Sequence, residues 1–235
     1  MKLLSLLTFI STSALCQNHI SCAIPIIRYE VEAIDNWGPD QKKLTGSAIS
    51  YGVVMKYSIQ PSVILGSRKL SVVVGGGYNN LVFRLRRPFD FESLVQPVFY
   101  TKRYAYNNLT GILGLKYRWL STKKYEMETE IAYSWLLTFR QTYTPTRRHV
   151  SSDPHKQINR DFMKYGGQAT ATLGVRKSVK TRLMVGFDLV IPFYTRWRMD
   201  EIFDDDSTEF FSAKYGFGAN INVVYRLNKS QPAEP

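Results

Sequence analysis

The chain has 235 residues, of which 44% are apolar and 21% are charged, and its formal net charge at pH 7 is +12. This composition excludes a disordered polymer. No run of about 18 apolar residues follows the N-terminus, so a membrane-spanning helix is not expected. The 15 Tyr and 13 Phe residues favour strands, and the length suits one large β domain.

The N-terminal residues resemble a secretory signal peptide. Lys2 supplies a positive charge, residues 3–10 form an apolar core, and Ala14 and Cys16 frame a small-x-small cleavage site. We therefore expect residues 1–16 to be removed. Cys22 then remains without a partner, so no disulfide framework is expected. Lipidation of Cys16 or Cys22 stays open as a minor alternative.

Eight segments alternate between apolar and polar residues, and this period of two is typical of strands with two unlike faces. In the last segment, Tyr215, Ile221 and Tyr225 share one face, whereas Asn220 and Arg226 share the other. The segments are residues 24–33, 47–57, 69–87, 109–119, 125–139, 164–175, 183–197 and 213–227. Within 69–87 the apolar phase changes from even to odd positions, which we interpret as a β-bulge near residues 75–80.

The connections between these segments alternate in length. Shorter ones lie near residues 59–67, 121–123 and 178–181, and longer ones at 37–45, 88–106, 143–159 and 201–207. An even number of strands with short turns at one end and long loops at the other predicts an antiparallel up-and-down β-barrel. We expect the barrel to cover residues 17–228, followed by a short periplasmic tail at 229–235.

The apolar face is expected to point outward into lipid. The segments are long enough to cross a bilayer at a tilt, and the polar face is rich in glycine, which suits a narrow lumen. Aromatic residues near the strand ends suit the headgroup level of a membrane: Trp119, Tyr125, Phe139, Trp197, Phe211 and Tyr225. A soluble, exported lipocalin-like barrel that binds a small apolar ligand has the same alternation turned inside out and remains an alternative.

With its signal peptide, alternating strands and alternating loops, the sequence resembles the small eight-stranded outer-membrane barrels of Gram-negative bacteria. The transmembrane domain of outer membrane protein A is one example, and residues 23–227 carry the resemblance. It implies an all-β transmembrane barrel of the porin-like superfamily in the bacterial outer membrane. The family includes adhesion, structural, lipid-modifying and unassigned proteins, and for this chain we expect a structural or surface-interacting role without enzymatic activity or a cofactor.

Charges on the polar face predict a lumen plugged by ion pairs. Glu126, Glu128 and Glu130 lie on one face of one strand, and buried carboxylates need counter-charges. A turn centred on Thr122 would set Arg118 opposite Glu126, and Lys116 opposite Glu128. The full predicted network is Arg28, Glu30, Lys116, Arg118, Glu126, Glu128, Glu130, Arg140, Arg176 and Asp188.

The predicted outer loops are basic. Their cations suit the phosphates of lipopolysaccharide, so outer-membrane lipid and lipopolysaccharide are the expected partners. No nucleic-acid partner is expected, and an unidentified protein partner stays open. The residues concerned are Arg87, Lys102, Arg103, Arg147, Arg148 and Lys156.

One loop suggests an alternative, enzymatic function. His149 and Ser151 are two residues apart, and this spacing resembles the His-x-Ser motif of outer-membrane lipid A deacylases. The resemblance implies a lipid A esterase in which His149 activates Ser151. Ser152 stands where that family has Asn, which argues against the alternative. We otherwise expect no catalytic residues and no metal site.

Overall fold

The computed structural model describes residues 18–35, 42–60, 69–89, 98–146, 157–159, 164–200 and 208–227. These residues form strands joined by short turns, and they contain no helix that is long and apolar enough to cross a membrane. The strands are β1 (His19–Asp35), β2 (Lys42–Ile59), β3 (Leu70–Phe89), β4 (Val98–Ser121), β5 (Tyr125–Thr146), β6 (Gln157–Asn159), β7 (Lys164–Lys180), β8 (Leu183–Asp200) and β9 (Thr208–Arg226).

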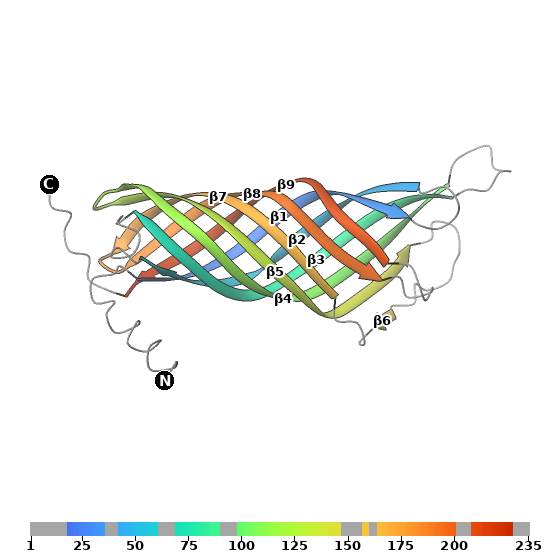
Figure 1. The fold of residues 1–235 in the computed structure, drawn as a ribbon, viewed down its shortest axis with the longest axis horizontal. Helices are drawn as coiled ribbons and strands as arrows, with labels where there is room; N and C mark the ends of the chain where they lie inside the picture. Colours follow the sequence, from blue (N-terminus) through green and yellow to red (C-terminus); the bar gives the residue numbers. More distant parts are fainter. Residues whose placement is uncertain are drawn as a thin grey trace, which may run out of the picture.

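Eight long strands close into one antiparallel barrel (Figure 1). Each long strand pairs with the next long strand along the chain, and β1 pairs with β9 to close the wall, with His19 opposite Arg226. The short β6 only adds to the outer part of β5. The predicted eight-stranded up-and-down barrel is confirmed.

The long strands contain 17 to 24 residues, whereas about 9–11 tilted residues cross a bilayer. The wall is therefore much longer than a membrane is thick. We call the half with the short turns at residues 122–124 and 181–182 the turn half, and the opposite half the loop half. Three residues that we expected in loops lie on strands instead, because the strands run further than the alternation indicated: Arg87 on β3, and Lys102 and Arg103 on β4.

The turn half carries an apolar belt on its outside. Phe187 is 54% exposed and Ile221 is 63% exposed, whereas Glu128 on the inner face is 3% exposed. Each long strand contributes exposed apolar side chains to this apolar belt, among them Ile24, Met55, Val74, Leu115, Ile131, Val175, Phe187 and Ile221. The predicted outward orientation of the apolar face is confirmed for this half.

The loop half has the opposite arrangement. Its interior holds an apolar core, formed by Ile27, Tyr29, Val31, Ala48, Leu81, Phe83, Tyr104, Tyr106, Leu136, Val190 and Trp197. The prediction that Trp197 belongs to an outer aromatic girdle is therefore wrong. On β1 the side chains of Tyr29 and Val31 point inward, so Arg28 and Glu30 point outward instead of into the lumen.

The exchange of faces on β1 and β3 needs no bulge. β3 keeps an unbroken register with both neighbours, so the bulge predicted near residues 75–80 is wrong. Val74 faces outward and Leu81 faces inward simply because apolar residues change sides along a regular strand. Where the wall meets lipid, its outer face must be apolar. Beyond the lipid the outer face meets water, so the apolar side chains lie in the lumen instead. On β8 a bulge does occur at Phe193, and it turns Trp197 inward.

Candidate functional site

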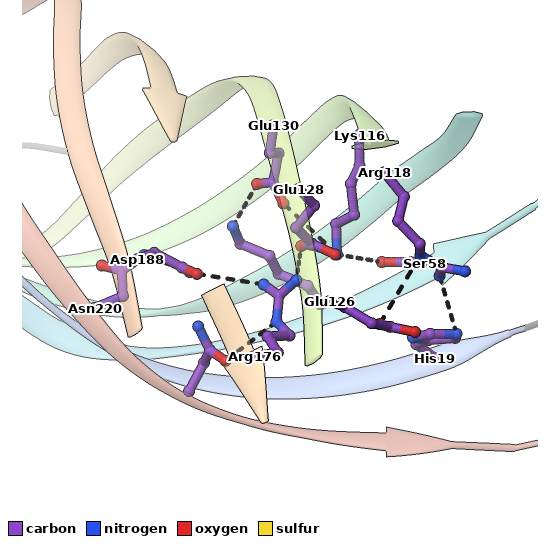
Figure 2. Close-up of polar contacts among 12 residues, drawn as sticks. His19, Ser58, Lys116, Arg118, Glu126, Glu128, Glu130, Arg176, Asp188 and Asn220 are labelled. Carbon is purple, nitrogen blue, oxygen red and sulfur yellow. Dashed lines mark hydrogen bonds and ion pairs between the residues drawn. The ribbon is translucent and has the colours of Figure 1, made fainter. Parts of the chain in front are cut away.

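The lumen of the turn half contains a charge network. Four carboxylates face five cationic side chains there, all from the described strands: Glu126, Glu128, Glu130 and Asp188 with Lys56, Lys116, Arg118, Arg176 and Arg226. They come from β2, β4, β5, β7, β8 and β9, and the three glutamates lie on β5 (Figure 2). Because the strands alternate, every second residue of β5 points inward, which places the glutamates at successive levels.

Glu128 and Arg176 form the centre of this charge network. Arg176 Nη1 forms an ion pair with Glu128 Oε1, and its Nη2 lies 3.4 Å from Asp188 Oδ1. Its Nε donates a hydrogen bond to Asn222 Oδ1 at 3.3 Å. Lys116 Nζ reaches the same Glu128 oxygen from β4 at 3.0 Å and donates to Ser58 Oγ at 3.1 Å. Each of these buried charges thus has partners on two or more strands.

The other two glutamates extend the charge network along the axis. Glu130 pairs with Lys56 of β2, and Lys116 Nζ lies 3.9 Å from its second oxygen. At the turn end, Glu126 Oε1 accepts from Arg226 Nη2 at 2.7 Å, and Arg118 Nε lies 3.8 Å from Glu126 Oε2. Arg118 also contacts His19 Nε2 at 3.5 Å. Carboxylates and cations alternate in this network, and their attraction offsets the desolvation penalty that a single buried ion would carry.

Two glycines make room for these side chains. A Cβ added at Gly174 would come within 2.5 Å of Asp188 Oδ1, and one at Gly186 would come within 2.7 Å of Arg176 Cγ. The glycine-rich polar face therefore accommodates large charged side chains in a narrow barrel.

The structure agrees with part of the predicted network. It buries Lys116, Glu126, Glu128, Glu130, Arg176 and Asp188 inside and half-buries Arg118. The predicted backbone register was off by two residues, since Arg118 pairs with Glu128 and Lys116 pairs with Glu130 across a bulge near Trp119. The predicted side-chain contacts nevertheless form on the diagonal.

Three predicted members do not belong to the lumen. Arg28 and Glu30 face outward for the reason given above. Arg140 is exposed, because a bulge at Phe139 shifts the phase of β5 and pairs Arg140 with the outward Asn107. Sequence reasoning missed Lys56 and Arg226. Both lie on the polar face of their strands, and this position was the signal that they point into the lumen.

The apolar core fills the lumen of the loop half. Phe83 is fully buried and packs edge-to-face on Tyr106 and Trp197, with ring centroids 5.7 and 5.2 Å apart. Tyr29 packs edge-to-face on Trp197 at 5.3 Å, and its hydroxyl accepts a hydrogen bond from Gln168 Nε2 at 2.8 Å. The buried hydroxyl of Tyr29 is thus satisfied within this layer.

The remaining predicted sites fall largely outside the described residues. His149, Ser151, Arg147, Arg148 and Lys156 lie there, as does the predicted signal peptide at 1–16. So do the side chains of Arg87 and Lys102, whereas Arg103 is exposed on β4. Cys22 is a free, exposed cysteine on the outer face of β1. Across the described ranges, no group of three His, Cys, Asp or Glu side chains is arranged to hold a metal ion.

Comparison with solved structures agrees with this architecture. Outer membrane protein OprG from Pseudomonas aeruginosa matches with a TM-score of 0.51 and 10% identity over 90% of this chain and 96% of that chain. The chain has the fold of an outer-membrane β-barrel. Its outer-membrane location, expected from the sequence, follows from this fold together with the apolar belt, and a soluble lipocalin-like barrel does not fit that belt.

Two further matches have lower TM-scores and carry no argument of their own. Neisserial surface protein A has a TM-score of 0.35 at 9% identity, covering 87% of this chain and 96% of that chain. A major outer membrane protein from Thermus thermophilus has a TM-score of 0.38 at 14% identity, covering 88% and 98%. No protein-family model matches the chain, and no curated protein matches it.

Proposed function

We propose that this protein is a non-enzymatic outer-membrane barrel with a closed lumen. It serves the envelope as a structural or surface-interacting wall, not as a pore. The observation that supports the proposal is that inward side chains lie in the lumen at two levels: the charge network in the turn half and the apolar core in the loop half. A solute on the barrel axis would have to displace both layers.

Two further observations support this role. Eight strands leave an interior just wide enough for side chains. Among the side chains that the structure describes, five arginines are exposed on strands of the loop half: Arg28, Arg84, Arg103, Arg140 and Arg196. Cations at this level suit the anionic outer leaflet of an outer membrane, so lipopolysaccharide contact is part of the proposal.

Conductance in planar lipid bilayers tests the closed lumen. We expect the purified protein to give no conductance above that of the protein-free bilayer. A variant that opens only the turn half (Lys116→Ala, Glu128→Ala and Arg176→Ala) should stay closed, and so should one that opens only the loop half (Phe83→Ala and Trp197→Ala). The combination of all five substitutions should conduct, because the two layers lie in series along the axis.

Heat-modifiable gel mobility in detergent verifies that each variant is folded before conductance is measured. Steady conductance of the unmodified protein would refute the closed lumen. Conductance from either partial variant equal to that of the combined variant would refute the two-layer arrangement.

A further inference from the structure

We propose that a groove on the outer wall of the loop half binds the phosphate group of an outer-leaflet lipid. Arg84 is its central ligand, with Arg28 and Arg103 on either side. The proposal rests on the proposed function, because the loop half must meet the headgroups of the outer leaflet.

The outer groove crosses β9, β1, β2 and β3 and has a volume of about 760 Å³. The strand alternation points most of its lining side chains outward, away from the apolar core. The short Ser47 on β2 leaves space between the aromatic residues of β9 and the arginine of β3. The outward side chains that define the outer groove are Arg28, Glu30, Ser47, Arg84, Tyr215 and Phe217.

Two arginines are direct cross-strand neighbours at the edge of the outer groove. Glu30, Ser47, Arg84 and Arg103 stand in one row across β1 to β4, and Arg84 is the direct partner of Arg103. Side chains directly opposite each other lie roughly 5 Å apart at Cβ, and like charges in that position destabilise a sheet. A bridging anion would remove this repulsion.

The guanidinium groups of these arginines are available to an anion. Among the residues that the structure describes, no hydrogen bond or ion pair engages the guanidinium of Arg28, Arg84 or Arg103. Guanidinium groups bind phosphate oxygens through two parallel hydrogen bonds, which makes phosphate a well-matched anion. Glu30 is the opposing carboxylate within the outer groove, so it lowers the affinity that the arginines supply.

The surroundings select a lipid over a free phosphate. Tyr215 and Phe217 are 59% and 60% exposed, and aromatic residues at this level mark the headgroup boundary of a membrane. One or two outward residues further toward the turn half, Ile26, Tyr51 and Ile221 are exposed parts of the apolar belt. A lipid can therefore place its phosphate on the arginines and its acyl chains on the wall below.

The experiment is a native mass-spectrometry titration of the full chain in detergent with bisphosphorylated lipid A. We expect Arg84→Gln to weaken binding about tenfold, because one charge-assisted hydrogen-bonded contact is lost. Adding Arg103→Gln should weaken it further, and Glu30→Gln should tighten it. Arg182→Gln is the matched control, since Arg182 is an exposed arginine at the short turn between β7 and β8, in the turn half and away from the outer groove, and it should leave binding unchanged.

Three outcomes would overturn the proposal. Equal weakening by Arg182→Gln would reduce the effect to net charge, and equal binding of dephosphorylated lipid A would exclude phosphate recognition. Full displacement of lipid A by inorganic phosphate at equal concentration would assign the outer groove to a free anion. Conductance of the Arg84→Gln variant should stay at the baseline, so failure here leaves the closed lumen unaffected.

Discussion

The two halves of the barrel use the same strands in opposite ways. In the turn half, exposed apolar side chains lie on the outside and the charge network lies in the lumen. In the loop half, the apolar core lies in the lumen, and the outside carries exposed arginines beside exposed aromatic residues such as Tyr215 and Phe217. β3 runs through both halves without a bulge, so the alternation of side chains does not by itself decide which face of a strand is apolar. The medium outside the wall decides it.

The largest expected effect comes from removing a central cation of the turn half. Arg176→Met should lower the free energy of unfolding by about 3–5 kcal/mol, because it leaves the buried Asp188 without its ion-pair partner and leaves Glu128 with Lys116 alone. Urea titration in lipid vesicles, followed by tryptophan fluorescence, measures this. Arg84→Met on the outside of the loop half is the matched control and should have a much smaller effect.

A double variant sharpens that prediction. Adding Glu128→Gln to Arg176→Met should restore part of the stability, since it neutralises one of the two carboxylates that lost Arg176. If the two effects simply add, Glu128 and Arg176 do not stabilise each other in the way the contact indicates.

An intermediate effect is expected from placing an arginine on the outer face of each half. Phe187→Arg puts a cation in the apolar belt and should reduce stability by about 2–4 kcal/mol, whereas Ala105→Arg in the loop half should reduce it by about 0–1 kcal/mol. The same urea titration compares the two. Equal losses would mean that both halves of the outer wall meet the same medium, which would break the comparison between them.

The smallest effect is expected at an exposed ion pair of the loop half. Lys214 Nζ lies 3.7 Å from Glu32 Oε1, and the lysine side chain is 59% exposed. Lys214→Ala should change the free energy of unfolding by less than about 1 kcal/mol. A loss as large as that of Arg176→Met would show that this pair is shielded from water.

The sequence predicted the strands, their number and the closed barrel, because a period of two and alternating connections are local signals. Most members of the charge network could also be recognised in the sequence, because the alternation turns Glu126, Glu128 and Glu130 to one face, where buried carboxylates need counter-charges. The sequence did not predict the apolar core. The alternation around Tyr29 and Val31 is the same whether these residues face lipid or the lumen. The sequence of a single strand does not indicate which part of the strand lies within the membrane.

The change of apolar phase within residues 69–87 was the signal for the exchange of faces. We interpreted it as a bulge because a bulge also shifts the phase by one residue. The same change occurs on β1, where Ile26 is exposed and Ile27 is buried. Two strands that change phase at corresponding positions indicate a change of medium, because a bulge is confined to one strand pair. Of the bulges that do occur, the one at Phe193 directly follows Pro192, and a proline inside a strand is a signal for a bulge that we did not use.

The distribution of the charge network over six strands constrains how the barrel can assemble. Arg226 on β9 meets Glu126 on β5, and Lys56 on β2 meets Glu130 on the same β5. An open sheet entering the bilayer would expose these ions to acyl chains, at a penalty that no early hairpin can offset. The pair of Arg226 and Glu126 can form only after β9 has joined the wall, so the charge network is complete only in the closed barrel.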